Sequence, residues 1–77
     1  MIAVHKIESI HFKQDFIILN IDGNELTIPL DLLSGRLKSA SDIERAMYKI
    51  SPSGYGIHWP LIDEDLSVDG ILRDFAK

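Results

Sequence analysis

The chain has 77 residues, no cysteine and a formal net charge of −4, with 45% apolar and 26% charged residues. A chain of this length forms one domain, residues 1–77, and its apolar fraction excludes a disordered tail. The absence of cysteine excludes a disulfide scaffold, a thiolate zinc site and a cysteine nucleophile, and it fits a reducing compartment.

The first thirty residues predict a three-stranded antiparallel meander. Residues 2–12 are rich in β-branched and aromatic types, and the phase of their alternation changes, which predicts a β-bulge or a bend near Ser9. Residues 16–21 form the most apolar run and are expected to be the central strand. The Asp22-Gly23 pair that follows is typical of a type I′ hairpin turn, because both central positions of that turn need positive φ.

The third strand and the helix after it meet at a proline. Leu26 and Ile28 alternate with polar residues up to Pro29, which has no N–H to donate and therefore places this strand at a sheet edge. Asp31 is suited to cap a short helix that continues through Leu37.

A capping box predicts a second short helix. The Ser41 hydroxyl can accept the backbone N–H of Glu44, and the Glu44 carboxylate can reach back to the N–H of Ser41. Ile43, Met47 and Ile50 recur at helical spacing, and we expect them to face the sheet.

A fourth strand is predicted after the Ser-Pro-Ser-Gly turn at 51–54. Tyr55, Ile57 and Trp59 alternate with small or polar residues until Pro60 ends the strand. The three side chains are expected on the core face of the strand. The alternative for Trp59 is contact with a partner, since tryptophan supplies much binding energy at interfaces.

The last helix has the clearest boundaries in the chain. Ser67 is a suitable N-cap, and Asp69 lies in the first turn, where the helix dipole favours a carboxylate. One apolar stripe runs along the helix and consists of Val68, Ile71, Leu72 and Phe75. Together the elements predict an α+β domain: a three-stranded antiparallel meander plus a fourth C-terminal strand, with two to three short helices packed on one side.

The three histidines do not form a recognisable metal motif. His5 and His11 lie on either side of the predicted bulge, and His58 lies on the fourth strand, so the chain has no helical His-x-x-x-His pair. The sequence therefore predicts no metal site and no cofactor.

The acidic run at 63–65 does not fit a calcium loop. It lacks oxygen ligands at alternating positions and the glycine that such a loop needs for its sharp turn. We expect instead that Asp63 or Asp65 accepts backbone N–H bonds in the turn before the last helix.

No catalytic arrangement is recognisable. Nucleophilic catalysis needs a serine or threonine beside a histidine and an orienting acid. Five of the seven serines lie where turns or helix caps explain them: Ser39, Ser41, Ser51, Ser53 and Ser67. A domain of this size also offers little concavity for the pocket of about 300 Å³ that a small ligand needs. We therefore expect no enzymatic activity.

The charges are unevenly distributed along the chain. Residues 60–77 carry five acids and two bases, whereas residues 35–50 carry four bases and two acids. A nucleic-acid-binding protein usually needs a clustered basic face. Four bases spread over sixteen residues of an acidic chain do not favour nucleic-acid binding, and the acidic C-terminal part is better suited to a basic protein partner or to a solvated surface.

Residues 55–72 carry a resemblance to a known family. They read Tyr-Gly-Ile-His-Trp-Pro-Leu-Ile-Asp-Glu-Asp-Leu-Ser-Val-Asp-Gly-Ile-Leu. This segment resembles the C-terminal signature of a small bacterial family, domain of unknown function family 2442, whose members often carry a Gly-Ile-His-Trp-Pro stretch and an Asp-Glu-Asp run. The Asp22-Gly23 hairpin and the helix at 41–48 are similar to the family's layout, in which tryptophan is common at the position of Tyr48.

The resemblance implies a small α+β domain without an established activity. Members are commonly encoded beside another small protein, in an arrangement similar to a toxin–antitoxin pair. Our hypothesis is therefore a non-enzymatic protein-interaction module, the antitoxin-like member of such a gene pair, which binds the more basic product of a neighbouring gene. The candidate partner-binding residues are His58, Trp59, Asp63, Glu64 and Asp65.

Two alternatives remain open at this stage. One is a nucleic-acid-binding transcriptional regulator that uses Arg36, Lys38, Arg45 and Lys49; the other is a small hydrolase, which needs a pocket joining His58 to the acidic run. A homodimer is a further possibility, because a domain this small buries only about 60% of its unfolded surface. No apolar run approaches the roughly 20 residues of a membrane span and no signal peptide is recognisable, so we expect a cytoplasmic protein.

Overall fold

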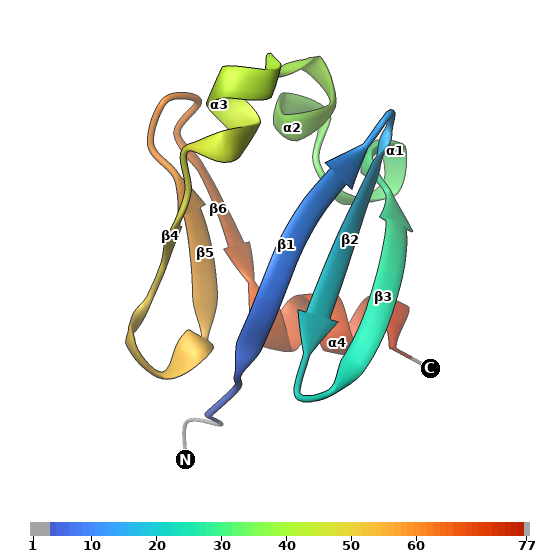
Figure 1. The fold of residues 1–77 in the computed structure, drawn as a ribbon, viewed down its shortest axis with the longest axis vertical. Coiled ribbons are helices and arrows are strands. Elements are labelled where there is room, and N and C mark those ends of the chain that lie inside the picture. The colour runs from blue at the N-terminus through green and yellow to red at the C-terminus, as the bar shows by residue number, and fades with distance from the viewer. Residues whose placement is uncertain (1–3, 77) are drawn as a thin grey trace.

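The computed structural model describes residues 4–76 and has the predicted α+β class. Two three-stranded antiparallel sheets face one another, with short helices at both ends of the pair (Figure 1). The first sheet is the predicted meander, in the order β1-β2-β3, and it consists of β1 (Ile7–Lys13), β2 (Phe16–Ile21) and β3 (Asn24–Pro29).

The details of the first sheet follow the sequence closely. The register of β1 on β2 shifts between Ile7 and Ser9, which confirms the predicted irregularity near Ser9. The apolar strand β2 is central, and β3 is an edge strand that ends at Pro29. Asp22 and Gly23 both have positive φ, 52° and 83°, as a type I′ turn requires. The expected strand start at residues 2 and 3 lies outside the described residues.

The second sheet contains more than the single expected strand. The expected fourth strand is β5 (Gly56–Trp59), and it lies between β4 (Lys49–Ile50) and β6 (Glu64–Ser67). A 3-10 turn, η1 (Pro52–Gly54), joins β4 to β5. The segment expected as a turn before the last helix is therefore largely a strand, because the main chain of residues 64–67 pairs with β5.

The helices close the two ends of the sheet pair rather than covering one side. Helices α1 (Leu30–Leu33), α2 (Gly35–Ser39) and α3 (Asp42–Ala46) lie at one end, and α4 (Val68–Phe75) lies at the other (Figure 1). The capping box of α3 is present, and the hydroxyl of Ser67 caps α4 by accepting the N–H of Gly70.

The first helical segment differs from the expectation based on Asp31. Pro29 is the N-cap of α1, and Asp31 lies within the first turn, where its carboxylate pairs with the ammonium of Lys38. Ser34 has an extended backbone that ends α1, and its hydroxyl accepts the N–H of Leu37 at 3.1 Å to start α2. One expected helix is therefore two, divided by a serine cap.

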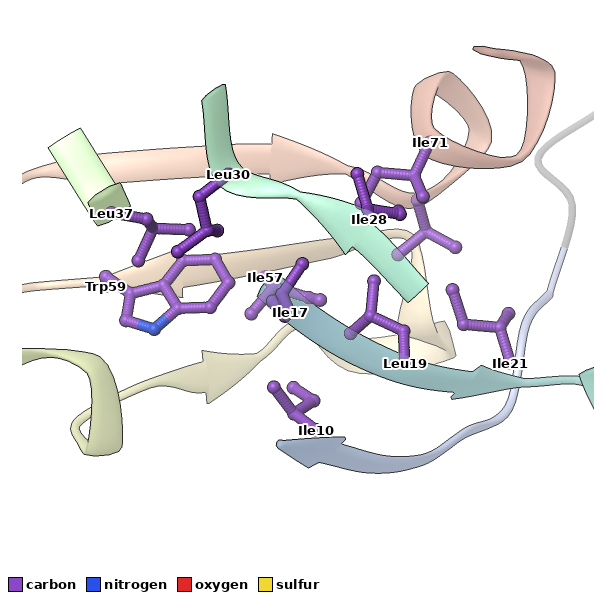
Figure 2. Close-up of a cluster of buried hydrophobic side chains, with 11 residues drawn as sticks. Ile10, Ile17, Leu19, Ile21, Ile28, Leu30, Leu37, Ile57, Trp59 and Ile71 are labelled. Carbon is purple, nitrogen blue, oxygen red and sulfur yellow. The ribbon is translucent and has the colours of Figure 1, made fainter. Parts of the chain in front are cut away.

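The core lies between the two sheets. Figure 2 shows apolar side chains of both sheets pointing toward one another, with Ile17 beside Ile57 and Trp59 near Leu30 and Leu37. The fully buried side chains at this interface come from β2, β3, β5 and the helices: Ile17, Leu19, Ile21, Ile28, Leu30, Leu37, Ile57, Trp59 and Val68. Each sheet has an apolar face, and the pair is stabilised because each sheet covers the apolar face of the other.

The apolar stripe expected on α3 does not face the core. Ile43 is 74% exposed and Met47 is 52% exposed, and Ile50 is exposed as well. Arg45 is buried in their place, because its guanidinium donates to the main-chain oxygens of Leu37, Gln14 and Lys38. Hydrogen bonds from a buried arginine thus decide which side of this short helix faces inward.

Tyr55 also differs from the expected core position. Its side chain is 53% exposed, whereas Ile57 and Trp59 are buried as predicted. Tyr55 has helical backbone angles as the C-cap of η1, and the strand begins only at Gly56. The residue therefore precedes the alternation of β5 and its ring lies at the surface.

Candidate functional site

Trp59, one of the five candidate contact residues, is a core residue. Its side chain is completely buried, and the rings of Phe12 and Tyr48 lie against it with centroids 6.4 and 6.2 Å away. Its indole N–H donates to the main-chain oxygen of Arg45 at 3.0 Å. Of the two alternatives for this tryptophan, the structure has the core position, so its side chain offers no surface to a partner.

His58 points to the opposite face of β5 and pairs with Asp65. In the antiparallel register His58 lies opposite both Lys49 on β4 and Asp65 on β6, so the three side chains form one row across the outer face of the sheet. The Nδ1 of His58 lies 2.7 Å from a carboxylate oxygen of Asp65. The structure therefore joins two of the five candidate contact residues, His58 and Asp65, by a hydrogen bond.

A groove of about 730 Å³ lies on the second sheet beside this row. Gly56, on the same face of β5 as His58, has no side chain, and its partner across the sheet is the small Ser67. The exposed ring of Tyr55 and Pro52 lie at the η1 end of the sheet. The lining residues are Lys49, Ile50, Ser51, Pro52, Tyr55, Gly56, Ile57, His58, Asp65, Leu66 and Ser67. The expectation of little concavity is therefore wrong.

The other two acidic candidates lie away from the groove. The carboxylate of Glu64 accepts the hydroxyl hydrogen of Ser34 and so joins β6 to the start of α2. Asp63 has a positive φ of 51° in the β5–β6 turn, and its main-chain oxygen accepts a hydrogen bond from Arg36. Of the acidic run, only Asp65 shares the groove with His58.

The groove brings together an imidazole, a carboxylate and two hydroxyl groups, but the hydroxyl groups are occupied. Ser51 bonds through its hydroxyl to both the N–H and the main-chain oxygen of Gly56, at 2.8 and 3.0 Å. The hydroxyl of Ser67 accepts the N–H of Gly70 at the start of α4. Among the described residues neither serine is hydrogen-bonded to His58, and the groove offers both polar groups and apolar surface to a ligand.

His5 was considered only as a metal ligand in the sequence, yet its ring is the most constrained imidazole in the structure. Its Nδ1 lies 2.8 Å from the Asp22 carboxylate and its Nε2 lies 2.6 Å from the Asp69 carboxylate. The hydrogen bonds to Asp22 and then to Asp69 raise the pKa of His5 above its ordinary value of 6.5. The partners are 17 and 64 residues away, so no local pattern could have revealed them.

His5, Asp22 and Asp69 form one group, the His5 cluster, in which the carboxylate of Asp22 has a second partner. It also accepts the backbone N–H of Lys6 at 2.7 Å. This bond, followed by the bond to His5, lowers the pKa of Asp22 below its ordinary value of 3.8. The two carboxylates bind opposite nitrogens of one ring and do not converge on a common point. Within residues 4–76 no group of three or more His, Cys, Asp or Glu residues could hold a metal ion.

The basic residues of 35–50 do not form one surface. The guanidinium of Arg45 is buried, and that of Arg36 donates to the main chain of Asp63. Lys38 pairs with Asp31, and Lys49 lines the groove of the second sheet. Three of the four basic side chains are thus bound to other groups of the fold rather than presented together to a phosphate backbone.

The comparisons agree with this fold. The family described as protein of unknown function (DUF2442) matches residues 7–77. The chain belongs to this family. The family assignment covers both sheets and all the helices, and therefore the groove, whereas His5 lies before the first matched residue.

One solved structure is similar to the chain over most of its length. It is the crystal structure, at 2.75 Å resolution, of a protein of unknown function from Rhodospirillum rubrum ATCC 11170. The two sequences are 27% identical, the match covers 91% of this chain and 87% of the other, and the TM-score is 0.71. No curated protein matches the chain. None of the helices in residues 4–76 is both long and apolar enough to cross a membrane.

Proposed function

We propose that this DUF2442 protein is a non-enzymatic interaction module that binds a segment of a basic partner protein in the groove of the second sheet. The observation that carries this proposal is the groove itself. It combines apolar surface from Pro52 and the exposed Tyr55 ring with the polar row of Lys49, His58 and Asp65. An apolar surface with a few fixed polar groups is the usual composition of a binding site.

The charge distribution favours a basic partner. The chain carries a net charge of −4, and the side chain of Asp65 at the groove is 75% exposed. Residues 60–77, which include β6 and α4, carry five acids and two bases. Opposite charges on the two proteins accelerate their encounter and set the orientation of the bound segment.

The absence of catalysis is part of the same proposal. The two groove serines use their hydroxyl groups to hold the backbone at Gly56 and Gly70. His58 is oriented by Asp65, and within residues 4–76 its Nε2 has no hydrogen-bond partner, so this nitrogen is proposed to bond a bound peptide. These groups are therefore proposed to recognise a ligand rather than to transform it.

We propose the product of a neighbouring gene as the partner, with this chain as the antitoxin-like member of the pair. This step rests on the family's usual gene arrangement. The two proteins are to be co-expressed, purified through a tag on the partner, and analysed by size-exclusion chromatography and titration calorimetry. We expect one complex at micromolar concentration. Growth arrest by the partner alone, relieved by co-expression, would support the antitoxin role.

Paired variants localise the binding surface. Tyr55→Ala and Asp65→Asn should each weaken the complex, Tyr55→Ala by about tenfold or more, because a buried aromatic anchor contributes most at an interface. Leu32→Ala and Glu25→Gln are the matched controls, since both residues are exposed and neither lines the groove. They should change Kd by less than about twofold.

Two results would count against the proposal. Separate elution of the two proteins at micromolar concentration would contradict the proposal that the neighbouring gene product is the partner. A complex that Tyr55→Ala and Asp65→Asn leave unchanged would remove the groove as its binding surface. DNA or RNA binding that falls steeply with salt would favour the regulator alternative instead.

A further inference from the structure

His5 lies at a junction of four parts of the chain. Its ring, 11% exposed, touches Asp22 in the β2–β3 turn through Nδ1 and Asp69 in the first turn of α4 through Nε2. The backbone N–H of His5 donates to the main-chain oxygen of Ser53 in η1 at 2.9 Å. His5, two residues before β1, therefore ties the first sheet to the helix and the turn that adjoin the groove.

The contacts of the His5 ring with Asp22 and Asp69 can exist together in only some of its protonation states. A neutral imidazole has one N–H donor and one bare acceptor nitrogen. A bare nitrogen cannot hydrogen-bond an ionised carboxylate, because neither group carries a proton. The two distances of 2.8 and 2.6 Å therefore fit an imidazolium that donates to Asp22 and Asp69 at once. Among the described residues, the charged groups that act on the ring are these two carboxylates, and η1 (Pro52–Gly54) contributes no titratable side chain.

The two carboxylates are not equally anchored. Asp22 also accepts the backbone N–H of Lys6, and this bond does not depend on the protonation of His5. Asp69 is 60% exposed, and within residues 4–76 its carboxylate is held by His5 alone. When the ring loses one proton, the remaining N–H is best used at Asp22, and the contact with Asp69 is the one that breaks.

We propose that His5 is a protonation-dependent latch that binds Asp22 and Asp69 as an imidazolium and releases Asp69 and the start of α4 when it becomes neutral. This latch regulates the groove, and that consequence rests on the proposed function of the groove. The latch itself is a property of the isolated chain.

Main-chain contacts carry the effect from His5 to the groove. A Cβ on Gly54 would lie 2.0 Å from the main-chain oxygen of His5, so the segment at His5 packs directly on η1. At the other end of the latch, Val68 donates its N–H to the main-chain oxygen of Tyr55 at 2.9 Å. Tyr55 and Ser67, the cap of α4, both line the groove. Release of Asp69 therefore loosens two walls of the groove.

NMR titration of the ¹³C,¹⁵N-labelled full chain tests the latch without any partner. We expect both ring nitrogens of His5 to be protonated at mildly acidic pH, and Asp69→Asn to lower the pH midpoint of the ring's titration. Asp74→Asn is the matched control, because it removes the same charge from α4 but its carboxylate pairs with Arg73. It should leave the midpoint close to that of the wild type.

The amide resonances of Tyr55 and Ser67 report on the groove in the same titration. They should shift with the midpoint of His5 in the wild type and lose this transition in Asp69→Asn. A His5 ring that stays neutral at mildly acidic pH, or a midpoint that Asp69→Asn leaves unchanged, would overturn the latch. Amides that do not follow the ring would overturn its link to the groove. A failed partner titration, by contrast, would affect only the proposed function.

Discussion

The indole N–H of Trp59 donates a hydrogen bond to the main-chain oxygen of Arg45, over an N···O distance of 3.0 Å, inside the core. This oxygen belongs to the last turn of α3, where carbonyl groups lack a partner further along the helix. The bond therefore attaches the end of α3 to the central strand of the second sheet. It explains how a helix of five residues keeps a defined position although its apolar side chains Ile43 and Met47 point to solvent.

Replacing Trp59 by phenylalanine should lower the free energy of unfolding by about 2 to 3 kcal/mol. The change removes the N–H donor, leaves the Arg45 oxygen unpaired in the core and opens a small cavity. Urea denaturation followed by far-UV circular dichroism measures the effect. Tyr48→Phe keeps the ring that packs on Trp59 and should change the stability by less than about 0.5 kcal/mol. Equal effects of the two substitutions would contradict a structural role for the indole N–H.

Replacing Arg45 by lysine should destabilise the fold by about 1 to 3 kcal/mol although the charge is kept. The guanidinium donates from three nitrogens to the main-chain oxygens of Leu37, Gln14 and Lys38, and an ammonium cannot reproduce this fork. Chemical denaturation provides the measurement. Arg73→Lys, at an exposed position on α4, is the control and should stay within about 0.5 kcal/mol of the wild type.

Two glycine substitutions should have opposite effects. Gly54→Ala places a Cβ 2.0 Å from the main-chain oxygen of His5 at a φ of +65°, so we expect a loss of more than about 1 kcal/mol. Gly35→Ala lies in α2 with open space around its Cβ, and it should stabilise the protein by about 0.4 to 1 kcal/mol. Melting temperatures from circular dichroism should fall for the first variant and rise for the second. A neutral Gly54→Ala would mean that the segment at His5 does not pack on η1.

The stability that His5 contributes should depend on pH in both directions. Because the pKa of His5 is raised above 6.5 in the fold, its contribution is complete below 6.5 and is lost as the pH rises through the folded value. Because the pKa of Asp22 is lowered below 3.8, its contribution is present above 3.8 and is lost as the pH falls through the folded value. The difference in unfolding free energy between the wild type and His5→Gln should therefore be largest between these limits. A difference that is constant over pH would contradict the ion pairs.

The acidic run at 63–65 shows why the candidate site was only partly predictable from the sequence. The alternation of β5 correctly places Ile57 inside and His58 outside, because successive side chains of a strand point to opposite faces. The pairing of Asp65 with His58 requires β6, and the polar sequence of β6 gives no strand signal. The residues of β6 adopt a strand conformation because the edge of β5 offers backbone groups with which they pair. The groove follows from that pairing and could not be foreseen from the sequence.

The first hairpin turn, the helix caps at Ser41 and Ser67 and the change of phase in the first strand were determined by the sequence alone. The positive φ values of Asp22 and Gly23, the capping box of Ser41 and the bulge before Ser9 depend on groups a few residues apart, so short patterns are sufficient to specify them. Only the tertiary structure decided that a second sheet covers the first, that Arg45 is buried and that His5 meets Asp69 across 64 positions. Those features depend on which distant groups are brought together when the apolar faces are removed from water, and no local pattern records that choice.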